Sequence, residues 1–445
     1  MFTALFHAPF SFGLRSVLSR QFLSCLVLAW SAVASFGIQA QPALTLDQAL
    51  RVAQDRSHQL VAQDAAAAAM REMAVSAGQR PDPTLKVGVN NLPIDGPDRL
   101  SLTRDFMTMR SVGVMQEITR SDKLKARSAR FEREAEAAGF ERALVLANLR
   151  RDTAMAWLDR HYQEQMLAVL QLQRAEASLQ IDAADAAYRS GGVGRGAQAD
   201  VFAARSAVAA IDDRIRQTES HVATAKTRLA RWVGDAANQP LAAPPALTVI
   251  RLDPSILDSQ LAHHPEIAVR VKQEEIALAD ADIARRNQRA DWSVELMLSQ
   301  RGRAYSNMVS INLSVPLQVD AQSRQNRDLA AKLAVAEQMR AQREEAAREH
   351  VAETRAWLQE WQSDRDRLSV HDSTLIPLAA ERTRAALAAY RGGAGPLSGV
   401  LEARRMEIDT RMDRLRLEME AAARWARLEY LLPPDHQGQS VATEK

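Results

Sequence analysis

One stretch of sequence decides the fold of this chain. Residues 322–391 read QSRQNRDLAAKLAVAEQMRAQREEAAREHVAETRAWLQEWQSDRDRLSVHDSTLIPLAAERTRAALAAYR, with no glycine and one proline, Pro377. Most of these residues are strong helix formers, above all Ala, Leu, Glu, Gln and Arg. A helix rises about 1.5 Å per residue, so we predict a single rod about 100 Å long. A compact enzyme has no use for a helix of this length.

Residues 121–190 form a second stretch of the same kind. It ends in Tyr188-Arg189-Ser190-Gly191, and the first stretch ends in Tyr390-Arg391-Gly392-Gly393. A glycine just past a helix supplies a left-handed cap, and a helical pattern resumes a few residues later in each case. We therefore predict two helical hairpins, with return helices at about 200–233 and 400–432, in an internally duplicated chain.

Two short segments with alternating apolar and polar residues precede each long helix, as in a β-hairpin. The hairpins span about 84–116 and 292–315. The alternation suits strands that face lipid on one side and water on the other, and equally half-buried strands of a soluble sheet. The residues assigned to the lipid-facing side are Leu85, Val87, Val89, Trp292, Val294, Leu296, Val309, Ile311 and Leu313.

These elements divide the chain into two repeats, 41–233 and 262–432. The proline-rich segment 234–261 is expected to be a connector across one end of the helical bundle. Residues 433–445 are expected to form a disordered tail. Residues 1–40 contain a basic start, an apolar run and small residues at two possible cleavage points, so we predict a cleaved signal peptide.

Charge and cysteine usage exclude several kinds of site. The formal net charge is +2, and the two arginines within 1–40 account for it, so nothing favours nucleic-acid binding. The one cysteine, Cys25, also lies in that segment. The mature chain therefore has no disulfide and no cysteine-based metal site.

Two β-hairpins supply four strands, which is too few to close a membrane barrel, since such barrels begin at about eight strands. Three copies of the chain would supply twelve. We therefore predict a homotrimer with a 12-stranded barrel that is continued by a hollow α-helical tunnel.

The order of three motifs carries a family resemblance: Leu44-Thr45-Leu46-Asp47-Gln48-Ala49-Leu50 before the first helix, Pro81-Asp82-Pro83 before the first strand, and Val400-Leu401-Glu402-Ala403 after the second tip. With them, the chain resembles the outer membrane factor family of TolC-like efflux channels over residues 44–432. The resemblance implies an outer membrane protein with a large periplasmic portion. It would be docked through a periplasmic adaptor onto an inner membrane pump, of the RND type.

Within that family, residues 91–109 look most like the outer membrane subunits of heavy-metal cation exporters. The implied function is a passive exit duct for such cations, with drugs or other small molecules as the alternative cargo. An alternative of another class is a periplasmic coiled-coil scaffold without a pore.

The resemblance also suggests where the duct narrows and where the adaptor binds. Glu402 and Asp200 are candidates for an acidic gate at the entrance, although two solvated charges that favour a helix N-terminus explain them equally well. The hairpin tips are expected to contact the adaptor through Tyr188, Arg189, Gly191, Gly192, Gly194, Tyr390, Arg391, Gly392, Gly393 and Gly395.

No residue pattern predicts an enzyme, a cofactor or a resident metal. His350-x-x-Glu353 lacks the second Glu-x-x-His motif of helical di-metal sites, so we interpret it as part of a solvated helix face. His263 and His264 precede Pro265 at a helix start, where turn structure accounts for them.

Overall fold

The computed structural model of this chain describes residues 43–189 and 198–432. Residues from Leu44 onward belong to one compact unit. The predicted signal peptide 1–40, the predicted tail 433–445 and the tip glycines Gly191, Gly192 and Gly194 lie outside the described residues.

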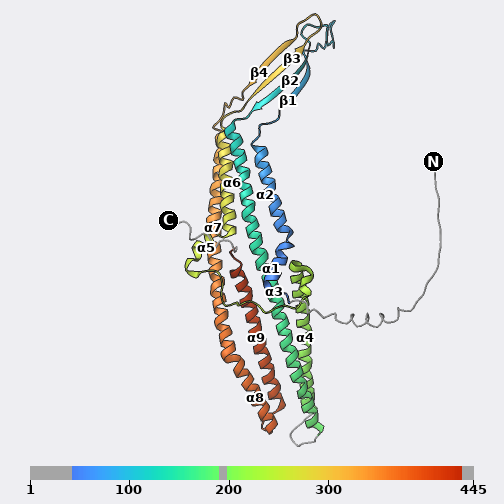
Figure 1. Ribbon diagram of the computed structural model, residues 1–445, viewed down its shortest axis with the longest axis vertical. Coiled ribbons are helices and arrows are strands. Elements are labelled where there is room, and N and C mark those ends of the chain that lie inside the picture. The colour runs from blue at the N-terminus through green and yellow to red at the C-terminus, as the bar shows by residue number, and fades with distance from the viewer. Residues whose placement is uncertain (1–42, 190–197, 433–445) are drawn as a thin grey trace, which may run out of the picture. The chain divides into compact units, whose positions relative to one another are not determined.

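In the first repeat, two short helices precede a pair of strands and two long helices follow it (Figure 1). These elements are α1 (Leu46–Asp55), α2 (His58–Ala77), β1 (Thr84–Asn90), β2 (Met109–Ile118), α3 (Ser121–Arg189) and α4 (Gln198–Val233). Local hydrogen bonds fix the start of α1: Thr45 Oγ1 accepts from the Gln48 N–H, while Gln48 Oε1 accepts from the Thr45 N–H.

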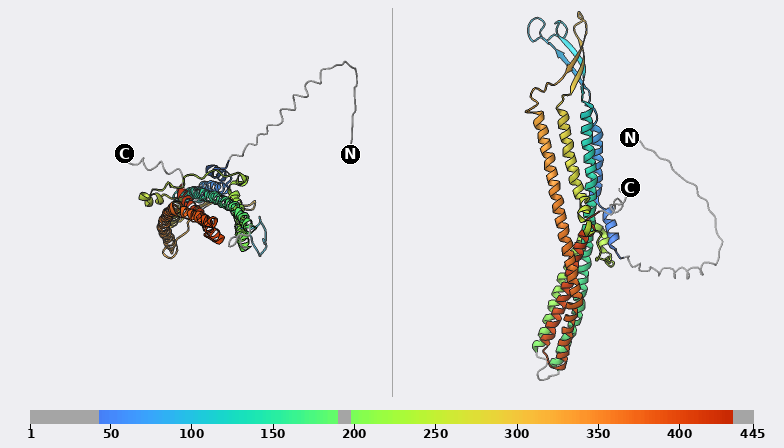
Figure 2. Two further views of the ribbon diagram at one scale, coloured as in Figure 1. Left: turned by 90° about the horizontal axis from the view of Figure 1, so that it is seen from below. Right: turned by 90° about the vertical axis from the view of Figure 1, so that its left-hand side faces the viewer.

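The second repeat has the same order of elements. They are α5 (Leu257–Ala262), α6 (Pro265–Asn287), β3 (Trp292–Gln300), β4 (Met308–Ser314), α7 (Gln325–Val370), α8 (Ile376–Gly392) and α9 (Leu397–Glu429). The predicted architecture of one chain is confirmed: it is mainly helical, with two repeats that each contain a two-stranded β-hairpin. Seen along the helices, the helical layer curves into an arc (Figure 2).

The four strands form one antiparallel sheet in the order β1-β2-β3-β4. The two predicted hairpins are joined through β2 and β3, whose register pairs Val114 with Leu296 and Val112 with Leu298. Figure 1 shows the sheet at one end of α3 and α7 and the helical hairpins at the other. The repeats therefore contribute equally to the sheet.

The long helix predicted over 322–391 is continuous from Gln325 to Gly392, but it is not a regular α-helix throughout. A π-helical turn, His371–Leu375, separates α7 from α8. Pro377 gives the physical reason, because proline cannot donate a backbone hydrogen bond and its ring clashes with the carbonyl four residues earlier. A wider π turn accommodates that defect without ending the helix.

The connector does not cross an end of the bundle, which is a second correction. α3 has 69 residues whereas α4 has 36, so the chain returning from the first tip leaves the bundle about halfway along α3. The connector begins there with a 3-10 turn, Gly234–Asn238, and packs beside α1 and the middle of α3. Figure 1 shows α1 and α5 near the middle of the long helices.

The largest hydrophobic cluster lies at this level and is centred on Trp157 of α3. Its indole is fully buried, and Nε1–H donates to the Leu44 carbonyl at 3.1 Å. Arg160, one turn further along α3, donates to the carbonyl oxygens of Ala237 and Gln239 at 2.7 and 2.9 Å. These bonds fasten the start of the unit and the connector to the same short section of α3.

Gly113 sits where β2 and β3 approach closely, and its replacement tests the sheet. A Cβ at Gly113 would lie 2.7 Å from the backbone oxygen of Leu296. We expect Gly113→Ala to destabilise the folded protein by about 1–3 kcal/mol, because the facing backbone cannot move aside. Thermal unfolding measures the effect. Gly88→Ala is the matched control, since its Cβ would meet only side chains, those of Ser111 at 3.7 Å and Asn90 at 4.0 Å. Equal losses of stability would contradict the role given to Gly113.

Candidate functional site

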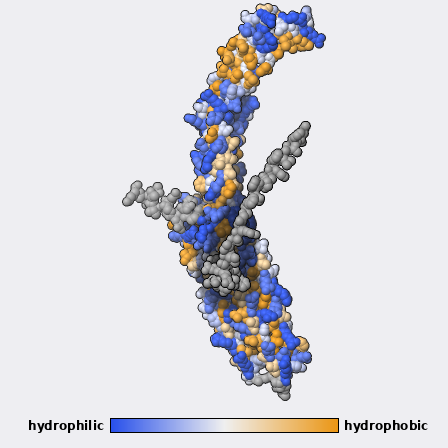
Figure 3. Space-filling view, turned by 45° about the vertical axis from the view of Figure 1, so that its right-hand side comes forward, coloured by the Kyte–Doolittle hydropathy of each residue, from blue (hydrophilic) through white to orange (hydrophobic). Residues whose placement is uncertain are grey.

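The apolar residues of the four strands share one face of the sheet, and that face is exposed. Directly paired residues in antiparallel strands lie on the same face, and the register aligns Leu85, Val114, Leu296 and Ile311 in one row across all four strands. The exposed fractions reach 77% for Val87 and 74% for Ile311. Figure 3 shows hydrophobic residues gathered over the sheet, whereas hydrophilic residues cover much of the helical surface.

All nine residues assigned to the lipid-facing side occupy this apolar face. Eight are exposed, and Val294 is half-buried. Val112, Val114 and Leu298 lie on the same face and are also exposed; the same alternation could have identified them. An exposed apolar surface on four neighbouring strands is unusual for a protein surrounded by water and marks an interaction surface.

The opposite face of the sheet is polar. Lys86 of β1 and Glu295 of β3 form an ion pair at 2.5 Å across the intervening β2. Ser310 and Asn312 of β4 share this side, paired with Met297 and Glu295. One face of the sheet therefore suits an apolar environment, and the other suits water. Separately, no helix within the described ranges is both long and apolar enough to span a membrane.

The hairpin tips lie at the end of the long helices that is opposite the sheet (Figure 1). Tyr188 and Arg189, the last described residues of α3, are exposed. At the second tip Gly393 adopts φ 76°, the left-handed cap expected of a glycine after a helix. The Ala394 N–H then donates to the Ala389 carbonyl at 2.9 Å, which closes the turn.

Other residues of the second tip differ in exposure. Arg391, Gly392 and Gly393 are exposed, whereas Tyr390 and Gly395 are half-buried. Tyr390 packs against the small apolar cluster that holds the two hairpins together near their tips. Its ring therefore has a structural role in addition to any contact with a partner.

The two gate candidates each lie near the start of a return helix, but their surroundings differ. Asp200 is half-buried in the first turn of α4. The Glu402 side chain is 69% exposed on α9 and lies 3.9 Å from Arg382 of α8. Glu402 lines a groove of about 810 Å³ between the two hairpins, whereas Asp200 does not. Within the described residues, no hydrogen bond links Glu402 to Asp200.

Ion pairs join the two hairpins beside this groove. Arg214 of α4 donates to Asp409 of α9 at 2.7 Å, and Arg404 of α9 donates to Glu176 of α3. Both pairs link the first repeat to the second within one chain. Charged side chains therefore link the two hairpins beside the groove.

The interpretation of His350 as part of a solvated helix face is wrong. His350 and His264 are only 7% and 4% exposed, and their ring centroids lie 4.2 Å apart. Burial lowers the pKa of His264 to about 3, with the neighbouring imidazole adding to the effect. Burial also lowers the pKa of His350, against the opposing charges of Glu266 and Glu353. Both rings are therefore neutral at neutral pH.

The His264 ring caps a helix, in addition to its predicted place in the turn before Pro265. His264 precedes Pro265 and takes an extended conformation, φ −61° and ψ 139°, as residues before proline do. Its Nδ1 accepts from the Glu266 N–H at 3.2 Å, so it caps α6.

Comparison with known proteins identifies the fold. No protein-family model and no curated protein matches this sequence. Among solved structures, the chain is similar to CusC, described in connection with transmembrane channel formation, at 15% identity and a TM-score of 0.71 over 87% of this chain and 92% of that one.

Two further solved structures are described as outer membrane channels. OprN is 16% identical, with a TM-score of 0.71 over 87% of this chain and 89% of its own. CmeC of Campylobacter jejuni is 12% identical, with a TM-score of 0.71 over 87% and 85%. At these identities the likeness is one of architecture. The chain therefore has the TolC-like fold, which it shares with solved outer membrane channels.

Proposed function

We propose that this chain is the outer membrane channel of a tripartite efflux system, a passive duct whose substrates are delivered by an inner membrane pump. The observation that carries the proposal is the exposed apolar face shared by all four strands, with a polar face behind it. Lipid on one side and a water-filled lumen on the other would satisfy both faces.

The unpaired edges of the sheet support a homotrimer. Within the described residues, β1 pairs only with β2 and β4 only with β3, so each leaves one backbone edge open. Unpaired strand edges are not tolerated in lipid, because no water is present to take their hydrogen bonds. If β4 of one copy pairs with β1 of the next, three copies close a ring of twelve strands, and three helical arcs surround a common axis.

The partners and the cargo follow from the family resemblance. The hairpin tips would contact a periplasmic adaptor, which connects the channel to a pump of the RND type. Heavy-metal cations are the proposed cargo, because residues 91–109 resemble the corresponding segment of metal exporters. Drugs and other small molecules are the competing cargo class.

Two experiments test this function. The purified full chain should give discrete conductance steps in a planar bilayer, and an inert membrane would contradict the duct. For the cargo, a deletion strain should lose tolerance to heavy-metal cations and regain it with the full chain, but not with the pump alone. Loss of drug tolerance with unchanged metal tolerance would instead favour the competing cargo class.

The gate assignment makes a separate prediction. If Glu402 narrows the entrance, Glu402→Ala should raise single-channel conductance, because it removes a side chain and a charge from the narrowest point. Glu381→Ala is a suitable control, since Glu381 is similarly exposed near the same tip but pairs with Arg384 on its own helix. Unchanged conductance in the Glu402 variant would make it an ordinary solvated charge at a helix start.

A further inference from the structure

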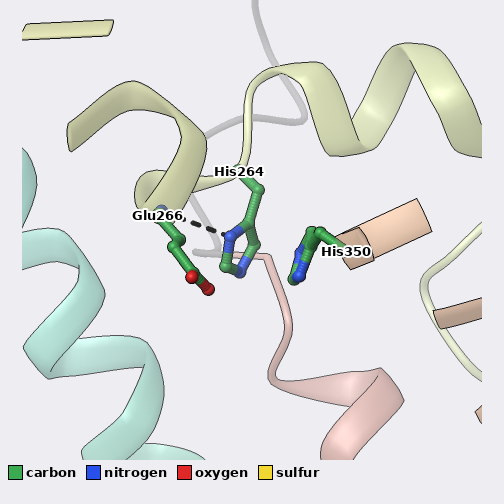
Figure 4. Close-up of side chains that lie close together, drawn as sticks. All are labelled: His264, Glu266 and His350. Carbon is green, nitrogen blue, oxygen red and sulfur yellow. Dashed lines mark hydrogen bonds between the residues drawn. The ribbon is translucent and has the colours of Figure 1, made fainter. Parts of the chain in front are cut away.

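Three side chains with metal-binding atoms meet where α6 begins beside α7. His264 caps α6, Glu266 is in its first turn, and His350 comes from the middle of α7 (Figure 4). Their candidate ligand atoms all lie within 4.8 Å of one another. The two histidines stand 86 positions apart in the sequence, since 350 minus 264 is 86, and only the antiparallel packing of α6 on α7 unites them.

One atom of this group lacks an interaction. His350 Nε2 is buried and has no hydrogen-bond partner among the described residues. Native proteins rarely leave a buried nitrogen unsatisfied, and a neutral imidazole nitrogen is the commonest metal ligand in proteins. A cavity of about 380 Å³ adjoins the group, with Glu353 and Asn148 also in its wall. Neither Glu266 nor Glu353 forms an ion pair in the described part of the chain.

We propose that His264, Glu266 and His350 bind one divalent transition-metal cation, of which Zn²⁺ is the representative. Imidazole nitrogen and carboxylate oxygen are the ligands that such cations take in proteins, commonly three from the chain and one from water. The cavity has room for the water. This site is distinct from the proposed lumen and cargo path, because its ligands come from the interior of one chain.

Binding requires small local changes. Metal–ligand bonds of about 2.0–2.1 Å place tetrahedral ligands about 3.4 Å apart. Atoms that now lie up to 4.8 Å apart must therefore approach by as much as about 1.4 Å. His264 Nδ1 accepts the capping bond, and the ring also interacts with the backbone of Leu431. Coordination through Nε2 moves the ring proton to Nδ1, so it gives up the capping bond and competes with the Leu431 interaction. Arg151 and Arg427 also line the cavity and oppose a cation, although Arg151 is paired with Asp152 at 2.8 Å. Glu353 in the same wall offsets the remaining positive charge, and Glu266 contributes its negative charge as a ligand.

The site lies at a junction of the fold. Tyr430 and Leu431, which follow α9, form part of the same cavity wall, as does Ala147 of α3. A bound cation would therefore link the start of α6 to α7 at the place where α9 ends and α3 passes. We expect it to stabilise this junction, where the connector returns to the helices.

Zinc titration of the full chain tests the site. The protein is purified without a histidine tag, in detergent, and treated with a chelator before the titration. We expect one high-affinity Zn²⁺ per chain and a rise in melting temperature on its addition. Glu266→Gln and His350→Leu should each weaken binding by about 100-fold or more, since even loss of a residue behind the ligands costs about 10–100-fold.

A second variant and a matched control make the zinc titration decisive. His350→Leu removes the unsatisfied nitrogen and should fold, and the partly exposed Glu266 provides a second variant that tests the same site. His263→Ala is the matched control, because this neighbouring histidine is exposed and points its Nδ1 at the Ser259 carbonyl. Zinc binding that is absent, or that is lost equally in the His263 variant, overturns the proposal.

Discussion

Replacing Ile311 by arginine is expected to abolish assembly of the protein in the outer membrane. Ile311 is at the centre of β4, on the apolar face. An arginine on the lipid face of a membrane strand costs about 2–4 kcal/mol near the midplane, and each trimer would carry three of them. The measurement is the amount of the protein recovered from outer membranes with detergent, compared with the unaltered chain.

Asn312→Arg is the matched control, because Asn312 is the next residue along β4, points to the polar face and is paired with Glu295. It should assemble normally, since opposite charges on paired residues are favourable. If the sheet belonged to a soluble scaffold, arginine at the exposed Ile311 would change stability by less than about 0.5 kcal/mol. Normal recovery of the Ile311 variant would therefore contradict the lipid-facing assignment.

Removal of the Trp157 indole is expected to have the second large effect. Truncation of a fully buried tryptophan to alanine costs roughly 3–5 kcal/mol. Here it also leaves the Leu44 carbonyl without its donor. We expect Trp157→Ala to lower the melting temperature of the helices strongly, as measured by circular dichroism, because α1, the connector and the end of α9 all pack on this cluster.

Trp232→Ala provides the comparison, since Trp232 is half-buried on α4 beside the Arg231 guanidinium. Its loss should be clearly smaller. Trp157→Phe should fall between the two, because it keeps an aromatic ring but not the N–H donor. Similar melting temperatures for all three variants would contradict the central place given to Trp157.

The sequence predicts the elements of this fold well because each has a local cause. The helix predicted over 121–190 is α3, Ser121–Arg189, and the second tip closes with Gly393 in the left-handed conformation. The apolar face of the sheet follows from simple alternation. These features depend on neighbouring residues along the chain, which a sequence displays directly.

Features that depend on packing were predicted wrongly, although the sequence contains indications of some of them. Pro377 marks the π turn that divides the second long helix. The return helices, at about half the length of α3, already imply that the connector joins the middle of the bundle. His264 and His350 precede and follow the second β-hairpin at similar distances, so antiparallel helices bring them together. The cavity beside His350 is nevertheless lined by residues of α3 and α9 as well, and nothing local in the sequence reveals that.

Three copies of this chain are proposed to form one closed β-barrel in the membrane. Native mass spectrometry of the complex extracted from outer membranes with a mild detergent measures this most directly. The account predicts a mass of three mature chains, obtained only when detergent is present. Recovery of a single chain from the periplasmic fraction without detergent would contradict it.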